Sequence, residues 1–137
     1  MTTEIRAKMF EPIPQEVDAL AASVVDAAFQ VHKALGPGLL ESVYETCLSQ
    51  ELKQRGIPFN SQVALPIHYN GLTLDNGLRL DMLIDSKLIV ELKAVEKMQP
   101  LHDAQLLTYL KLSGLRLGLL INFNTTLIKD GIKRIAR

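Results

Sequence analysis

Three charged residues between Asp81 and Lys93 are candidates for a catalytic or metal-binding role. Nine residues separate Asp81 from Glu91, and Glu91 and Lys93 flank Leu92 in an apolar segment. Side chains on a strand point alternately to opposite faces, so Glu91 and Lys93 would share a face. Two carboxylates set face to face repel each other unless a cation lies between them. If Asp81 lies opposite Glu91, the segment can therefore hold a divalent metal ion with an ammonium group beside it.

The register of the predicted hairpin decides whether the two carboxylates meet. Alternating apolar residues on both sides of residues 85–87 predict two short strands around a tight turn. A three-residue loop pairs Ile84 with Leu88 and places Asp81 directly opposite Glu91, with Cβ atoms roughly 5 Å apart. A two-residue loop slips the register by one and sends the carboxylates to different faces.

A solvent-exposed strand is the competing interpretation of Glu91 and Lys93. Glu and Lys are mostly exposed in proteins, so Glu-X-Lys taken alone is more often a solvated face than a site. The opposed Asp81 favours a site, because Mg²⁺ binds through one or two carboxylates plus waters and substrate phosphate oxygens. Lys93 would then orient or deprotonate a water, or neutralise charge that develops on a phosphate.

The flanking sequence predicts the helices that must position these side chains. Apolar residues recur at helical spacing over 14–35, 38–55 and 100–112, and glycine follows each segment. An acid in the first turn of a helix, such as Glu41, is favoured by the helix dipole and needs no further role. Gln105 and Tyr109 are four residues apart on the third helix, a commonplace pair in itself.

The remaining segments predict strands. Residues 57–69 indicate one or two strands broken near Pro66, and Asn70-Gly71 is a strong hairpin signal. Asp75-Asn76-Gly77 predicts a second turn before the central hairpin. A nearly continuous apolar strand, suited to a parallel sheet with a helical crossover, and a short edge strand are expected at 115–123 and 132–135. The pattern as a whole predicts an α/β fold with a mixed sheet of four to six strands.

Three motifs in this order resemble a known family. Asp81 followed by Glu-Leu-Lys at 91–93 resembles the core of the PD-(D/E)XK nuclease superfamily, although Leu80 stands where the motif name has Pro, a position that varies. Residues 38–44 resemble the naming motif of the GxxExxY proteins, a small bacterial and archaeal group within that superfamily. Residues 105–109 are similar to the QxxxY box of its exonuclease-like branch. The resemblance covers nearly the whole chain.

The resemblance implies a fold and a set of site residues. The fold is a restriction-endonuclease-like αβββαβ core, a mixed sheet flanked by helices. Asp81 and Glu91 would bind Mg²⁺ or Mn²⁺, and Lys93 would be catalytic. Glu41 would be a further metal ligand or a catalytic acid that positions water.

Two helical residues complete the site that the resemblance implies. Gln105 would hydrogen-bond a water at the metal or a phosphate. Tyr109 would contact the substrate backbone. Both would lie on a helix face turned toward the central hairpin.

The implied function is metal-dependent hydrolysis of phosphodiester bonds in nucleic acid, with DNA the expected substrate. The alternative is a non-catalytic nucleic-acid-binding or assembly module that retains the nuclease scaffold, since fold does not fix function. The formal net charge is zero, which leaves little basic surface for binding DNA. A homo-oligomer or another partner could supply that surface. A small-molecule binder finds no support, because the sequence has no glycine-rich phosphate loop.

Length and composition set the remaining expectations. A chain of 137 residues with 47% apolar content fits one domain over 1–137, with a flexible arm at 1–14. No apolar run reaches membrane-spanning length, so no membrane partner is expected. Cys47 is the only cysteine, which excludes an internal disulfide and favours a cytoplasmic location.

Charge is unevenly distributed along the chain. Residues 1–50 hold three Lys/Arg against seven Asp/Glu, whereas 110–137 hold six against one. The C-terminal excess predicts either a phosphate-facing patch or a solvated sheet edge whose charges deter aggregation, and the sequence favours neither.

Overall fold

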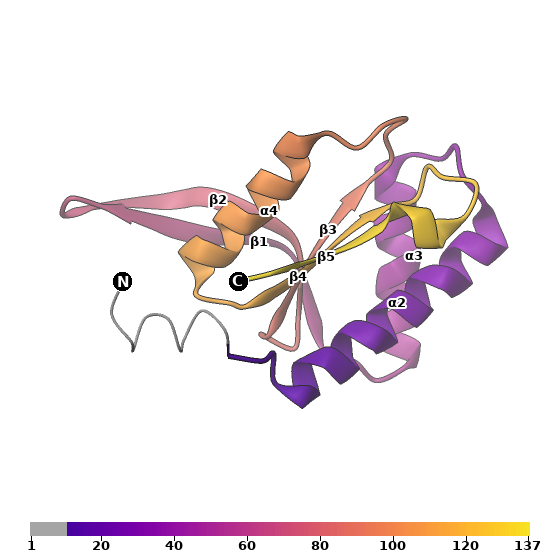
Figure 1. Ribbon diagram of the computed structural model, residues 1–137, viewed down its shortest axis with the longest axis horizontal. Helices are drawn as coiled ribbons and strands as arrows, with labels where there is room; N and C mark the ends of the chain where they lie inside the picture. Colours follow the sequence, from indigo (N-terminus) through magenta and orange to yellow (C-terminus); the bar gives the residue numbers. More distant parts are fainter. Residues whose placement is uncertain (1–10) are drawn as a thin grey trace.

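The computed structural model describes residues 11–137, and residues 1–10 of the predicted arm lie outside the described part. A five-stranded mixed sheet forms the centre of the molecule, with strands in the order β1-β2-β3-β4-β5 (Figure 1). Its strands are β1 (Phe59–Tyr69), β2 (Leu72–Ile84), β3 (Leu88–Lys93), β4 (Leu117–Asn122) and β5 (Ile132–Ala136). The α/β fold expected from the sequence is therefore confirmed.

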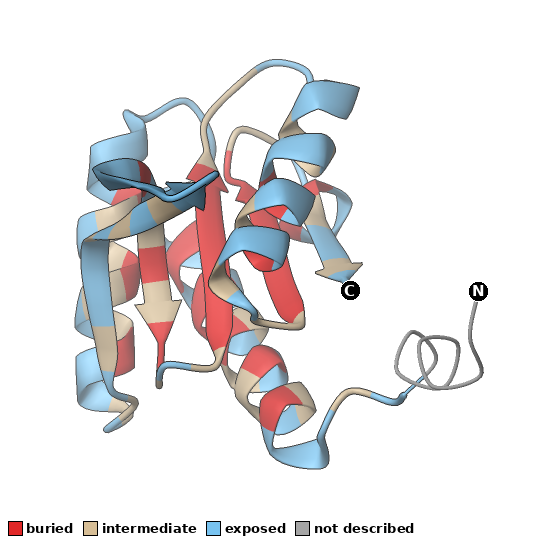
Figure 2. Ribbon diagram, turned by 90° about the vertical axis from the view of Figure 1, so that its left-hand side faces the viewer, coloured by how far each residue is buried: buried red, intermediate tan, exposed pale blue. Residues whose placement is uncertain are grey.

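Helices cover both faces of the sheet. Helices α2 (Gln15–Leu35) and α3 (Glu41–Gln54) pack against one face, where they enclose the larger apolar cluster. Helix α4 (Pro100–Ser113) covers the other face through Leu106 and Leu110. Figure 2 shows the buried central strands between these helical layers. None of the helices within residues 11–137 combines the length and apolarity needed to cross a membrane.

The β3–α4–β4 segment forms the predicted βαβ unit. Strands β3 and β4 pair in parallel from Leu88↔Leu117 to Lys93↔Asn122. Every residue of β4 is buried, as expected for a parallel strand covered on both faces. Gly118 brings β4 close to α4, because a Cβ at this position would lie 2.8 Å from Leu106 Cδ1. This close packing places α4 directly over the central strands.

The hairpin of β1 and β2 confirms one predicted turn and corrects another. Asn70 and Gly71 both have positive φ, as the predicted two-residue turn requires. The second turn predicted at 75–77 is wrong, because β2 continues through these residues as a bulge. Asn76 has a φ of 58°, and the register shifts there opposite Pro66 of β1. The distal half of this hairpin projects from the body of the molecule (Figure 1).

The central hairpin has the register that the three-residue loop predicts. Ile84 pairs with Leu88 and Met82 pairs with Val90. Asp85 and Ser86 adopt positive φ, and the N–H of Lys87 closes the turn on the carbonyl of Ile84 at 2.9 Å. Continuing this register by one step brings Asp81 opposite Glu91.

The basic C-terminal segment is partly neutralised by acids elsewhere in the fold. After η1 (Ile128–Gly131), strand β5 carries Lys133, which pairs with Asp103 of α4, and Arg134, which pairs with Asp18 of α2. These ion pairs tie the sheet edge to helices on both faces. The pairing favours the interpretation of this segment as a charged sheet edge over a continuous phosphate-facing patch.

Candidate active site

Asp81 and Glu91 lie where β2 and β3 separate. The backbone ladder between these strands ends at Met82↔Val90. One step further, the N–H of Asp81 donates to Glu91 Oε1 at 3.1 Å, and the N–H of Leu92 donates to Asp81 Oδ2 at 2.9 Å. Both carboxylates therefore occupy the gap between the strands and accept backbone N–H groups.

An irregularity in β2 opens this gap. Leu80 packs in the apolar cluster under α4, whereas Met82 packs in the cluster under α2 and α3. Leu80 and Met82 are two residues apart and would lie on the same face of a regular strand. The alternation of side chains between the two faces of β2 therefore breaks at Asp81. On the adjacent strand β1, Gln62 lies opposite Asp81, between the pairs Ser61↔Met82 and Val63↔Leu80. Gln62 has a positive φ of 53°. The break frees the Asp81 N–H to bind a carboxylate.

Burial sets the protonation of Glu91. Only 4% of this residue is exposed. Desolvation, and then the negative charge of Asp81, raise the pKa of Glu91 from its ordinary 4.5 to about 8, although the Asp81 N–H and the Lys93 ammonium oppose the shift. In the metal-free protein, the raised pKa favours the protonated form of Glu91 at neutral pH and so lowers the negative charge of the pair.

Lys93 lies at the end of β3, and Asn122 of β4 anchors the chain beyond it. Asn122 is 2% exposed; its Oδ1 accepts from the N–H of Val95 at 3.1 Å and its Nδ2 donates to the Val95 carbonyl at 2.9 Å. The N–H of Phe123 also bonds to the Lys93 carbonyl at 2.9 Å. The sequence pattern did not identify this role of Asn122, although a polar residue in an otherwise apolar strand indicates that its side chain needs hydrogen-bond partners.

Glu41 reaches the site from the N-terminus of α3. It is the first helical residue and is exposed. Partial desolvation raises the pKa of Glu41, the charge of Asp81 raises it further, and Lys93 lowers it. These influences place the Glu41 carboxyl within electrostatic reach of the sheet residues.

Tyr44 fixes the loop that precedes Glu41. Its hydroxyl donates to the Gly36 carbonyl at 2.7 Å and accepts from the N–H of Leu39 at 3.1 Å. Its ring is fully buried and stacks on Phe123, with centroids 4.6 Å apart. Tyr44 therefore contributes to the site by holding the chain that delivers Glu41 rather than by facing the carboxylates.

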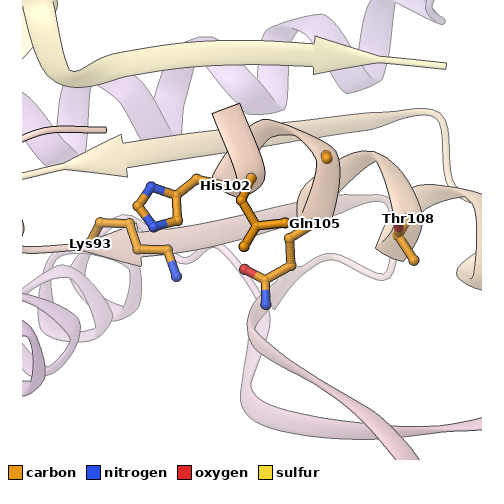
Figure 3. A pocket seen from close by; sticks show the side chains of 6 residues that line it. Lys93, His102, Gln105 and Thr108 are labelled. Carbon is orange, nitrogen blue, oxygen red and sulfur yellow. The ribbon is translucent and has the colours of Figure 1, made fainter. Parts of the chain in front are cut away.

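Helix α4 closes the opposite side of the site. Burial raises the pKa of the half-buried Tyr109, the charges of Glu91 and Asp81 raise it further, and a side-chain hydrogen bond with Gln105 lowers it. Gln105 and Lys93 also line a pocket of about 530 Å³ between β3 and α4 (Figure 3). His102 lines the same pocket.

Comparison with known protein families shows which family this chain belongs to. A model described as the PD-(D/E)XK nuclease superfamily matches residues 18–135. This chain belongs to the PD-(D/E)XK nuclease superfamily. The matched range includes every residue of the site just described.

One solved structure has a similar fold. The crystal structure of SSO0001 is similar to this chain with a TM-score of 0.54 and 24% identity over 71% of the chain. The chain spans about half the length of that solved protein, so the likeness concerns the fold alone. No curated protein matches the chain.

The carboxyl groups of Asp81 and Glu91, in the gap between β2 and β3, are suited to bind a divalent cation of the kind that PD-(D/E)XK nucleases generally use. Glu91 is buried and Asp81 is partly buried, their carboxyl groups face each other, and a cation would replace the proton that the raised pKa of Glu91 favours. Within residues 11–137, no three His, Cys, Asp or Glu side chains gather closely enough to form a metal site by themselves. Asp81 and Glu91 would therefore hold an ion together with waters or phosphate oxygens, an arrangement typical of Mg²⁺.

Proposed function

We propose that this chain is a divalent-metal-dependent nuclease that hydrolyses phosphodiester bonds of nucleic acid, with DNA as the substrate. One observation carries the proposal: Asp81 and Glu91 share the gap between β2 and β3, and Lys93 follows on the same strand. Membership of a nuclease superfamily supports a nucleic-acid substrate. Superfamily membership does not specify that the substrate is DNA, which ion binds, or that the chain is catalytically active. The proposal adds these three points.

Asp81 and Glu91 are the proposed ligands of Mg²⁺ or Mn²⁺. Such an ion lowers the pKa of a water and polarises a phosphoryl group. The Glu91 carboxyl would release its proton as the ion binds, because ligand oxygens must be free of protons. The backbone N–H groups of Asp81 and Leu92 keep one oxygen of each carboxylate fixed throughout.

Lys93 is the proposed catalytic ammonium group. It shares a strand face with Glu91, and its ammonium charge opposes the rise in the pKa of Glu91, so the two groups are close in space. From this position Lys93 can orient the attacking water or stabilise the negative charge that develops on phosphate.

Three helical side chains complete the proposed site. Glu41 would position water or join the metal ligands from α3, since its carboxyl lies within electrostatic reach of Asp81 and Lys93. Gln105 would donate its amide to a phosphate oxygen. Tyr109, one turn further along α4, would contact the nucleic-acid backbone.

We also infer that the chain is a GxxExxY protein within the superfamily. Support comes from the way residues 38–44 act as one unit. Gly38 adopts a φ of 96°, Glu41 begins α3, and Tyr44 ties down the loop between Gly36 and Leu39. The glycine forms the turn, the glutamate supplies the carboxyl group at the start of α3, and the tyrosine holds the loop in place.

A cleavage assay with matched variants tests the nuclease proposal. Wild-type protein with Mg²⁺ or Mn²⁺ should cut single-stranded, duplex or branched DNA, and EDTA should stop the reaction. Asp81→Asn and Lys93→Met should each lower the rate about a hundredfold or more. Asp85→Asn and Lys87→Met make the same changes in the turn of the same hairpin and should leave the rate unchanged. Cleavage that persists in both site variants would eliminate this site.

A non-catalytic nucleic-acid-binding or assembly module is the second candidate. Zero net charge and the pairing of Lys133 and Arg134 with acids favour its assembly role, because they reduce the basic surface with which a lone chain could bind DNA, and a second copy or a partner would supply that surface. Divalent-ion titration separates the two functions. A nuclease should bind Mn²⁺ through Asp81 and Glu91, whereas a scaffold module should bind DNA with steep salt dependence and no need of metal.

A further inference from the structure

The pocket between Lys93 and α4 has the character of an anion site. It measures about 530 Å³, within the range of small-ligand sites. Two apolar and four polar side chains line it, and each polar one can donate a hydrogen bond: Leu101, Ala104, Lys93, His102, Gln105 and Thr108. No acid is among these lining residues. The acid next to His102 in sequence, Asp103, pairs with Lys133 of β5.

The imidazole of His102 is held in one orientation and one tautomer. The backbone N–H of Gln99 donates to His102 Nδ1 at 3.1 Å, and the backbone N–H of His102 donates to the Gln99 carbonyl at 2.9 Å, so the His102 side chain caps the start of α4. An N–H donor requires Nδ1 to be an acceptor, so the proton of the neutral ring lies on Nε2. The other ring nitrogen is thereby left as a hydrogen-bond donor. In Figure 3 the His102 ring lies beside Lys93 at the same pocket.

Polar residues continue from His102 along one side of α4. Gln105 and Thr108 follow at intervals of three, which keeps them on neighbouring positions of the helix surface. Figure 3 shows His102, Gln105 and Thr108 in succession along the helix, with Lys93 next to His102. A row of donors with one cation suits the phosphate oxygens of a nucleic-acid backbone, which proteins contact mainly through such groups.

We propose that His102 Nε2–H donates a hydrogen bond to a non-bridging oxygen of a nucleic-acid phosphate in this pocket, next to the phosphodiester held at Asp81 and Glu91. This inference rests on the proposed function for its substrate class. It gives His102 a direct contact with substrate in addition to its capping role.

Two substitutions separate the contact with substrate from the cap. His102→Asn places Oδ1 near the position of Nδ1, so it keeps an acceptor for the Gln99 N–H and loses the distal donor. His102→Gln places its amide nitrogen near the position of Nε2, so it keeps the distal donor and loses the cap. The two roles therefore predict opposite orders of activity.

The experiment measures cleavage of a labelled DNA oligonucleotide with Mn²⁺, and its binding with Ca²⁺ in place of Mn²⁺, alongside thermal unfolding. His102→Asn should unfold like the wild type yet lower the cleavage rate and the DNA affinity about ten- to hundredfold, the effect of losing one hydrogen bond to a charged group. His102→Gln should unfold at a lower temperature and stay within about threefold of wild type in both assays.

The outcomes distinguish failure of this contact from failure of the nuclease proposal. Wild-type activity and affinity in His102→Asn, or equal losses in both variants, would overturn the contact and leave His102 as a helix cap. If the wild type binds DNA without cutting it, the nuclease proposal fails, and the binding data alone decide on His102 by the same criterion. A wild type that neither binds nor cuts DNA overturns both.

Discussion

Glu91 accepts a hydrogen bond from the backbone N–H of Asp81 at 3.1 Å, and Asp81 accepts one from the N–H of Leu92, the residue after Glu91, at 2.9 Å. Each acid is thus fixed by the backbone of the strand that carries the other. The geometry of the pair therefore depends on how β2 meets β3. Because both acceptors are carboxylates, the arrangement also couples strand pairing to charge.

The stability of the metal-free protein should fall as pH rises from about 5 to about 8. The pKa of Glu91 is raised to about 8 in the folded state from an ordinary 4.5, so over this range the folded state holds a proton that the unfolded state has lost. The contribution of Glu91 to the slope is at most about 1.4 kcal/mol per pH unit. Urea denaturation in EDTA at several pH values measures it.

Matched glutamine variants test the assignment of this slope. Glu91→Gln keeps an oxygen acceptor for the Asp81 N–H and removes the titration, so its slope should be flatter. The same change at the exposed Glu96 should keep the wild-type slope. An unchanged slope in Glu91→Gln would show that the dependence arises elsewhere.

Mg²⁺ or Mn²⁺ should stabilise the folded protein, and more at pH 8 than at pH 6. A ligand that binds only the native state raises stability by mass action, and the ion competes with the proton on Glu91 at the lower pH. Thermal unfolding with and without the ion measures the shift. Asp81→Asn should lose it and Asp85→Asn should keep it; a full shift in Asp81→Asn would contradict the proposed ligand pair.

Tyr44→Phe should cost about 1–2 kcal/mol of unfolding free energy and also lower nuclease activity. The substitution removes the hydrogen bonds to Gly36 and Leu39 while the ring keeps its stacking on Phe123. The freed loop would then present Glu41 less well. Tyr69→Phe is the matched control, because Tyr69 is 66% exposed on the projecting hairpin. Wild-type cleavage by a folded Tyr44→Phe would separate the loop from catalysis.

Asn122→Ala should lower activity through Lys93. It leaves the N–H and carbonyl of Val95 without their side-chain partner, at about 1–3 kcal/mol for each group left unsatisfied. The chain that follows Lys93 would then lose its anchor. Chemical denaturation and DNA cleavage measure the two effects. The exposed Asn60→Ala should change neither, and full activity in Asn122→Ala would show that Lys93 needs no such support.

Local patterns in the sequence predicted most of the elements. Apolar spacing located the helices within a few residues, because a helix must bury one side against the sheet. The turn at Asn70-Gly71 was predicted correctly, since few residue pairs tolerate two positive φ angles. The turn predicted at 75–77 was wrong because Asn76 with a positive φ is equally compatible with a bulge.

Sequence patterns alone were enough to predict the α/β fold and the set of acids and lysine on one strand pair, and they limited the central hairpin to two registers. These features follow from periodicity and loop length, which act over a few neighbouring residues. The three-dimensional structure was needed to show which register the hairpin takes, that burial raises the pKa of Glu91, that Tyr44 holds the Glu41 loop, and that His102 lines the pocket beside Lys93. Burial, the field of a neighbouring charge and contacts between distant elements depend on where the chain folds back, and no local pattern encodes them.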